Sequence, residues 1–146
     1  MSREYPVHPR VGVGAVVLDG DRVLLVKRGQ PPALGKWSLP GGLVHLGETT
    51  REAVVREVAE ECGLTIAVAG LADVVDRVTR DADGRVKYHY VLVDYLAYPQ
   101  STRISSGSDA AEARWVELGR VAELDTTDGL LEMIRRAQAL RRGAGA

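Results

Sequence analysis

The feature that most constrains the fold is one helix with two defined ends, residues 49–63, set among strand-like segments. Thr49 followed by Glu52 forms a capping box, in which each side chain binds a first-turn backbone N–H that has no helical partner. Gly63 suits the left-handed residue that closes a helix. A helix fixed at both ends must bury one face, and the neighbouring segments predict that it packs on a sheet.

Strand-like segments lie on both sides of this helix. Asp19-Gly20-Asp21 between the first two predicts a hairpin, and Gly70 predicts a bulge in the third. A second helix is predicted over residues 128–142. This order predicts an α+β fold with helices packed on a mixed sheet. The segments rich in apolar, β-branched and aromatic residues are 11–18, 23–26, 66–79, 86–97 and 114–118.

Length and composition fit one globular domain covering residues 1–146, with 45% hydrophobic and 27% charged residues. A net charge of −1 gives no general attraction to a nucleic acid polymer or an anionic membrane. No run approaches the roughly 18 apolar residues that span a bilayer, so we expect a cytoplasmic protein. The single cysteine, Cys62, excludes an intramolecular disulfide and is expected to be buried in the helix.

On a helical wheel the residues of this helix divide into two adjacent arcs. Glu57, Glu60 and Glu61 form an acidic arc, with the small Ala53 among them leaving the carboxylates accessible. The other arc is apolar and is expected to face the core: Val54, Val55, Val58, Ala59 and Cys62.

The acidic arc is costly for an isolated helix. Like charges at i,i+3 and i,i+4 cost roughly 0.2–0.5 kcal/mol per pair, and negative charge near a helix C-terminus costs about 0.3–1 kcal/mol more. A solvated acidic face is the plain interpretation. A binding site for a hard divalent ion, Mg²⁺ or Mn²⁺, is the alternative, because carboxylate oxygens suit those ions. Zinc is disfavoured, since the three histidines show no ligand spacing.

The segment before the helix adds to this site. A loop containing Gly41-Gly42 can bring a backbone carbonyl close to a metal ion or a phosphate, because no side chain intervenes. Glu48 precedes the helix by two residues and is expected to pair with Arg56, which would orient both side chains. Two independent surface charges are the alternative interpretation of this pair.

These residues together resemble the Nudix box. Gly42 is followed after five residues by Glu48, and after seven more by Arg56-Glu57-Val58-Ala59-Glu60-Glu61-Cys62-Gly63-Leu64. The resemblance implies an α/β/α sandwich with a central mixed β-sheet. It also implies hydrolysis of the diphosphate in a nucleoside diphosphate linked to another group, X. The reaction would need a divalent cation, usually Mg²⁺, for which Mn²⁺ can substitute.

The resemblance assigns roles to the residues that match the box. It implies Glu57, Glu61 and Glu60 as metal ligands, with the carbonyl of Gly42 completing the site. Arg56 and Glu48 would orient them. A carboxylate near the attacking water takes its proton, and the candidates for this general base are Glu60, Glu57, Asp109 and Glu112.

The box does not identify X. ADP-ribose or a nucleotide sugar is favoured on the overall layout, with a nucleoside triphosphate pyrophosphohydrolase that removes oxidised or non-standard nucleotides as the alternative. A nucleotide sensor without hydrolase activity is disfavoured because the box is complete. Arg28 is expected to meet a phosphate, and Tyr88 and Tyr90 to stack on a base, unless these three serve only surface charge and packing. Many Nudix proteins are dimers, so the resemblance also implies a homodimer.

Overall fold

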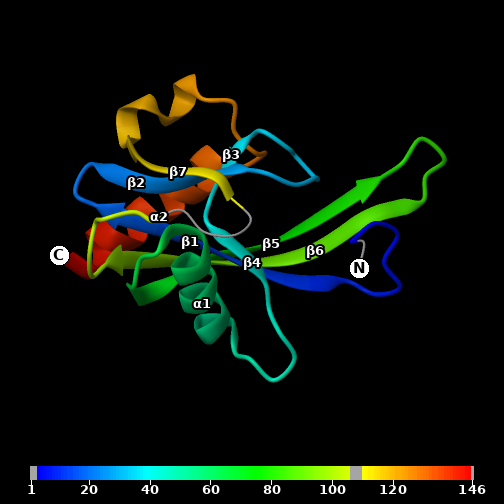
Figure 1. The fold of residues 1–146 in the computed structure, drawn as a ribbon, viewed down its shortest axis with the longest axis horizontal. Helices are drawn as coiled ribbons and strands as arrows, with labels where there is room; N and C mark the ends of the chain where they lie inside the picture. Colours follow the sequence, from blue (N-terminus) through cyan, green and yellow to red (C-terminus); the bar gives the residue numbers. More distant parts are fainter. Residues whose placement is uncertain (1–2, 106–109, 146) are drawn as a thin grey trace.

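The computed structural model describes residues 3–105 and 110–145. Strands dominate the chain, with one helix between the fourth and fifth strands and a second at the end (Figure 1). The elements are β1 (Arg10–Asp19), β2 (Arg22–Arg28), β3 (Trp37–Ser38), β4 (Gly41–Leu43), α1 (Thr50–Cys62), β5 (Ile66–Arg80), β6 (Val86–Pro99), β7 (Ala110–Glu117), the 3-10 helix η1 (Leu118–Glu123) and α2 (Leu130–Gly145).

The sheet is mixed, as predicted. Its main path runs β3-β2-β1-β6-β5, while β4 pairs with β1 and β7 pairs with β2. β1 runs parallel to β6, with Arg10 opposite Tyr90 and Gly14 opposite Asp94. The remaining strand pairs are antiparallel. The expected hairpin between β1 and β2 is present. β1 lies at the centre of the sheet, because it also pairs with β4 and β6.

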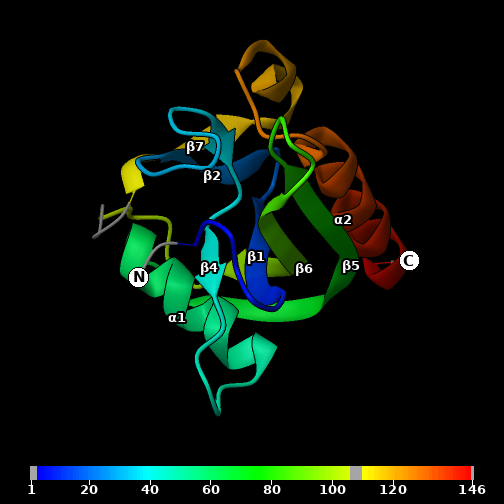
Figure 2. The ribbon, with the colours of Figure 1, turned by 90° about the vertical axis from the view of Figure 1, so that its right-hand side faces the viewer.

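The two long helices cover opposite faces of this sheet (Figure 2). Alternate residues of β1 divide the core, since Val13, Ala15 and Val17 pack with α1 whereas Val16 and Leu18 pack with α2. This alternation is the period of two that a strand buried on both faces requires. The α+β sandwich predicted from the sequence is confirmed.

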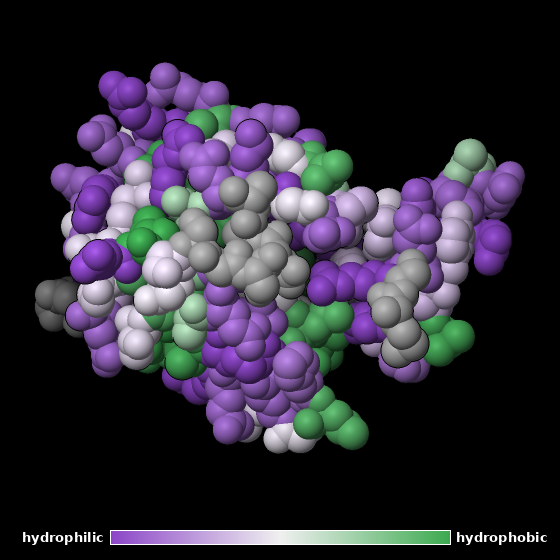
Figure 3. Space-filling view, in the orientation of Figure 1, coloured by the Kyte–Doolittle hydropathy of each residue, from purple (hydrophilic) through white to green (hydrophobic). Residues whose placement is uncertain are grey.

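β5 and β6 extend beyond the body of the molecule as a two-stranded arm (Figure 1). The pairing register shifts around Gly70, as predicted for a bulge, and the arm turns at residues 81–85. The space-filling view is hollowed between this arm and the body (Figure 3). The N-terminal segment lies along the arm, where the Tyr5 N–H donates to the Lys87 carbonyl at 2.8 Å.

Three local expectations were wrong. Gly41-Gly42 is part of β4, because Gly41 and Gly42 pair with Gly14 and Val13 of β1. Ala53 is fully buried rather than placed among accessible carboxylates, and Ala59 is exposed rather than in the core. α1 is thus rotated from the expected orientation, and Glu61 turns inward with only 9% of its surface exposed.

Two further observations complete the fold. Cys62 is buried as expected, and burial raises the pKa of its thiol to about 12. Among the described residues, no helix is long and apolar enough to cross a membrane.

Candidate active site

The ends of α1 are fixed as the sequence predicts. The Glu52 N–H donates to Thr49 Oγ1 at 3.1 Å, and the Thr49 N–H donates to Glu52 Oε1 at 2.9 Å. Gly63 closes the helix with φ 67°, and its N–H donates to the Ala59 carbonyl at 3.0 Å. These caps set the start and end of the helix and so hold the position of each box side chain along it.

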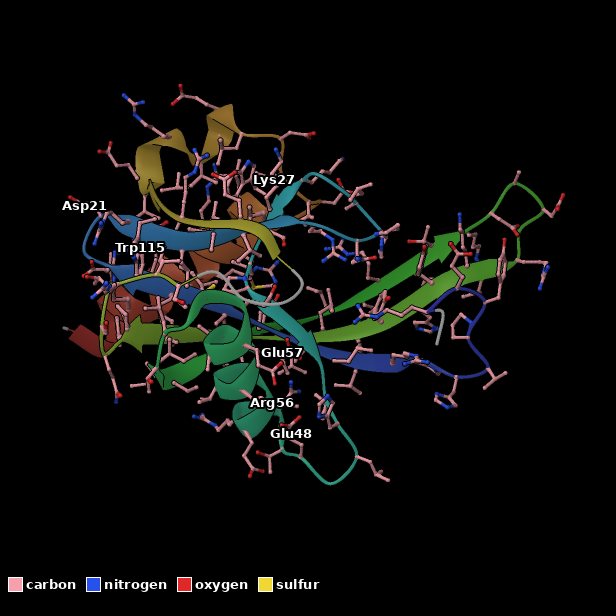
Figure 4. All side chains as sticks on the ribbon, in the orientation of Figure 1. Asp21, Lys27, Glu48, Arg56, Glu57 and Trp115 are labelled. Carbon is pink, nitrogen blue, oxygen red and sulfur yellow. The ribbon has the colours of Figure 1, made fainter. Side chains whose placement is uncertain are left out.

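Arg56 is the centre of the site, and all five of its N–H donors are used. Nε and Nη2 donate to the two oxygens of Glu48 at 2.7 and 2.9 Å, the expected pairing. Nη1 donates to Glu57 Oε1 at 2.7 Å and to Glu60 Oε2 at 3.2 Å, and Nη2 also donates to the Leu43 carbonyl at 3.0 Å. Arg56 thus ties α1 to β4 and to the loop before the helix (Figure 4).

Charge pairing explains why this cluster holds together. The hydrogen bonds from Arg56, and then the one from the His45 N–H, lower the pKa of Glu48 to about 2. Glu48 in turn raises the pKa of Arg56. Both groups are therefore ionised at every pH at which an enzyme works. The repulsion among the glutamates is offset by a guanidinium that the sequence placed on their flank.

Both glycines of β4 face a box glutamate. A Cβ on Gly42 would lie 2.4–2.6 Å from the carboxylate atoms of Glu57, so any side chain there would displace that carboxylate. The Gly41 N–H donates to Glu61 Oε1 at 2.7 Å across the open edge of β4. The backbone of β4 and the C-terminal half of α1 therefore form the two walls of one site.

The candidate general bases differ in their surroundings. Of the two candidates on α1, Glu60 is the more exposed to solvent, with 50% of its side chain exposed against 15% for Glu57. Glu112 lies on β7, where its carboxylate pairs with Arg114 at 2.5 Å. Asp109 lies outside the described residues. The structure therefore places Glu60 and Glu57, but not Glu112, in the cluster around Arg56.

Within the described chain, no three His, Cys, Asp or Glu side chains converge as a ready-made metal site. The donors nevertheless fit a hard divalent cation, because the groups beside Gly41-Gly42 offer carboxylate oxygens only. Glu57 and Glu60 each bind Arg56 through one oxygen, and the second has no hydrogen-bond partner among the residues that the structure describes. A cation would draw these carboxylates together with Glu61.

The three expected substrate contacts lie in one neighbourhood. Burial lowers the pKa of Arg28, and Tyr90, Glu61 and Tyr88 act on its charge in the opposite direction. Tyr88 and Tyr90 stack on each other, with ring centroids 6.3 Å apart, and both are buried. The buried Tyr90 hydroxyl has no hydrogen-bond partner in the part of the chain that the structure describes. Their packing role is observed, and their role as substrate contacts stays a prediction.

One buried charged residue was missed at the sequence level. Asp94 interrupts the apolar run Val91-Leu92-Val93 before Tyr95, and only 7% of its surface is exposed. Burial raises the pKa of its carboxyl to about 6, against the lowering effect of Arg77. An acidic residue inside the most strand-like segment was the signal that could have identified it.

The comparison with protein families matches this geometry. The NUDIX domain model covers residues 8–137, nearly the whole chain. This chain is a member of the Nudix family. The family predicted from the box is therefore confirmed, and the chain is a Nudix hydrolase; enzymes of this kind use a divalent cation and act on small nucleotides.

Individual Nudix relatives carry several activities in their names. An ADP-ribose pyrophosphatase of Methanocaldococcus jannaschii is 36% identical over 118 residues, 81% of this chain and 68% of that protein. A putative 8-oxo-dGTP diphosphatase 2 of Mycobacterium tuberculosis is 45% identical over 65 residues, 44% of this chain and 46% of that protein.

Solved structures agree on the fold. A MutT Nudix hydrolase from Burkholderia pseudomallei is 32% identical, with a TM-score of 0.74 over 88% of this chain and 98% of that one. The Nudix domain of Shewanella oneidensis NrtR, in complex with ADP ribose, is 26% identical, with a TM-score of 0.73 over 91% and 88%.

Proposed function

We propose that this Nudix hydrolase cleaves the diphosphate of ADP-ribose or of a nucleotide sugar, with Mg²⁺ as its cation and Mn²⁺ as a substitute. The observation that carries the proposal is the cluster in which Arg56 binds Glu48, Glu57 and Glu60 beside the glycines of β4. Glu57, Glu60 and Glu61, with the carbonyl of Gly42, would hold the cation. When bound, a divalent cation neutralises the diphosphate and lowers the pKa of water.

The chain's own residues supply positioning and proton transfer. Arg56 has no N–H left for a substrate, so it acts as a positioning residue that holds Glu57 and Glu60. Glu60 is half exposed and keeps one carboxylate oxygen for other partners, so it is our choice of general base for the attacking water. Arg28 and the Tyr90 hydroxyl would bind the nucleotide beside Glu61.

The relatives that match most of this chain favour ADP-ribose as the substrate. The ADP-ribose pyrophosphatase of M. jannaschii matches 81% of this chain, including the strands that flank the box in sequence. The Nudix domain of NrtR was solved with ADP ribose and shares the fold over most of its length. Together these make a nucleoside diphosphate linked to a sugar the first substrate class to test.

A second candidate is a nucleoside triphosphate pyrophosphohydrolase. It is favoured by the match to the 8-oxo-dGTP diphosphatase, which has the higher identity, 45%, over the shorter stretch of 65 residues. The two candidates differ in product. ADP-ribose gives a nucleoside monophosphate and a phosphorylated sugar, whereas a triphosphate gives a monophosphate and pyrophosphate.

A substrate panel separates them. Purified protein is incubated with Mg²⁺ and ADP-ribose, nucleotide sugars, dinucleoside polyphosphates, NADH or nucleoside triphosphates including 8-oxo-dGTP, and products are resolved by chromatography. We expect ADP-ribose or a nucleotide sugar to have the highest kcat/KM, and EDTA to abolish turnover. Preferred release of pyrophosphate from a triphosphate would support the second candidate, and no turnover of any member would refute the hydrolase proposal.

A further inference from the structure

Asp94 is a buried carboxylate that the proposed hydrolysis does not use. Ser38, Glu61 and Asp94 are the buried polar or charged residues that the structure identifies outside its aromatic side chains. Ser38 donates to the Leu39 carbonyl at 3.2 Å, and Glu61 accepts from Gly41. The carboxylate of Asp94, by contrast, has neither a hydrogen bond nor an ion pair within residues 3–105 and 110–145; Arg77 acts on it through its charge alone.

The Asp94 carboxylate extends from β6 over the neighbouring strand β1, which separates β6 from the glycines of β4. A Cβ on Gly14 would lie 2.5 Å from Asp94 Oδ1, so the carboxylate lies over the bare backbone of β1. Gly14 pairs with Asp94 on one side and with Gly41 on the other. Gly41 in turn donates its N–H to Glu61. Asp94, Gly14 and Gly41 thus form one row across the sheet, and Glu61 of α1 binds the end of this row.

The row has a length that suits a nucleoside. Adjacent strands lie about 4.8 Å apart, so the backbones of Asp94 and Gly41 are separated by roughly 10 Å. Between them lies Gly14, which offers no side chain, with Leu39 beside it. A diphosphate held next to Glu61 would leave its ribose and base to extend over a similar distance, across the glycine toward Asp94.

A carboxylate that lies over a glycine backbone, with the apolar Leu39 beside it, suits a planar ring with N–H donors. An ionised carboxylate only accepts hydrogen bonds, and the exocyclic amino group of a purine offers two donors. Packing alone would favour an apolar residue at position 94, because the strand around it is apolar and an unpaired buried charge costs free energy. Buried polar groups without partners instead give strong selection for a ligand that satisfies them.

We propose that Asp94 reads the nucleobase of the substrate by accepting hydrogen bonds from the amino group of a purine. This inference rests on the proposed function, since it places the diphosphate at the box glutamates. It adds a specificity-determining residue to the site, on the face of the sheet opposite α1. A structural role, in which Asp94 only balances the charge of Arg77, is the competing explanation.

Binding of nucleoside monophosphates tests this without turnover. Calorimetry with Mg²⁺ present compares AMP and GMP with purine riboside monophosphate, which lacks an amino group. We expect wild type to bind AMP or GMP at least about tenfold more tightly than the unsubstituted purine, because a hydrogen bond to a charged group is being lost. Asp94→Ala should reduce this preference to within about threefold, whereas the near-isosteric Asp94→Asn, which keeps one neutral acceptor oxygen, should give an intermediate preference, with the fold verified by circular dichroism.

Asp73→Asn is the matched control. Asp73 lies opposite Asp94 on β5 but pairs with Arg136, so its replacement should leave base preference unchanged. Wild type without a preference for an amino purine, or an Asp94→Ala variant that keeps it, would overturn the inference. Failure of the proposed function appears separately, as absent hydrolysis of ADP-ribose and all other diphosphates while the base preference persists.

Discussion

At the scale of single residues, Gly42 determines where the Glu57 carboxylate lies. In Gly42→Ala the new methyl group would meet that carboxylate at 2.4–2.6 Å and displace it. Because displacement by about 1 Å can cost about 10²-fold in rate, we expect kcat to fall by that order. Overpacking should also destabilise the fold by about 1–3 kcal/mol. Steady-state hydrolysis and urea unfolding measure the two effects.

Gly119→Ala is the matched control for this change. A Cβ on Gly119 meets no atom within 4 Å, so activity and stability should both stay close to wild type. Gly42→Ala with unchanged kcat would show that the position of Glu57 is irrelevant to turnover.

Asp94 links stability to pH at the same scale. Burial raises its pKa from 3.8 to about 6 in the folded state, so its ionisation destabilises the fold as pH rises between these values. Asp94→Asn should therefore stabilise the protein by up to about 3 kcal/mol above pH 6, and by little near pH 4. Urea unfolding of wild type and variant at pH 4 and pH 8 measures the difference.

A pH-independent difference between the two proteins would mean that the carboxyl group has the same pKa in the folded and unfolded states, so that burial does not penalise its charge. A large loss of stability in Asp94→Asn at pH 8 would point to a structural role instead. The predicted combination of higher stability and weaker base selection is typical of a residue kept for function at a cost to the fold.

At the scale of elements, α1 carries three carboxylates near its C-terminal end, with no basic residue in its last turn. Binding of a cation to the native state alone should stabilise the protein, by about 2.7 kcal/mol at a concentration 100 times the Kd. Thermal unfolding with and without Mg²⁺ measures this gain. Glu57→Gln should remove most of it, whereas Glu132→Gln on α2 should keep it.

An equal Mg²⁺ response in wild type and Glu57→Gln would place the cation elsewhere. The absence of any response at millimolar Mg²⁺ would argue that the carboxylates pair with Arg56 permanently rather than exchange it for a metal.

The helices and strands also show which parts of the fold could be predicted from the sequence. α1 was predicted with both ends because its caps are local: Thr49 and Glu52 at one end and Gly63 at the other. β3 and β4 were missed because they have only two and three residues, and their extended form depends on pairing with β2 and β1. Propensity carries no signal for strands defined by their partners.

The same reasoning applies to the site. The pairing of Glu48 with Arg56 was predictable from the box, since Glu48 lies just before the helix and Arg56 reaches back to it from about two turns into the helix. The burial of Ala53 and the exposure of Ala59 were not, because a helical wheel gives relative angles but not the direction of the sheet. Asp94 was missed because its place in the site depends on the register between β6 and β1.

At the scale of the whole molecule, two faces of one sheet contribute to the candidate site. α1 supplies the carboxylates on one side and β4 the glycines that they face, while β6 supplies Asp94 on the other side, and Gly14 and Gly41 connect them. In the roles that we propose, the diphosphate and the nucleobase are therefore bound from opposite faces of the sheet.

The central claim is that the box glutamates hold the cation on which hydrolysis depends. The most direct measurement is the rate of ADP-ribose hydrolysis across a Mg²⁺ titration, for wild type and Glu61→Gln. Glutamine keeps an oxygen that accepts from the Gly41 N–H but loses the charge, so the fold should survive. We expect kcat to fall by orders of magnitude with circular dichroism unchanged. A Glu61→Gln variant with wild-type rate and Mg²⁺ dependence would contradict it.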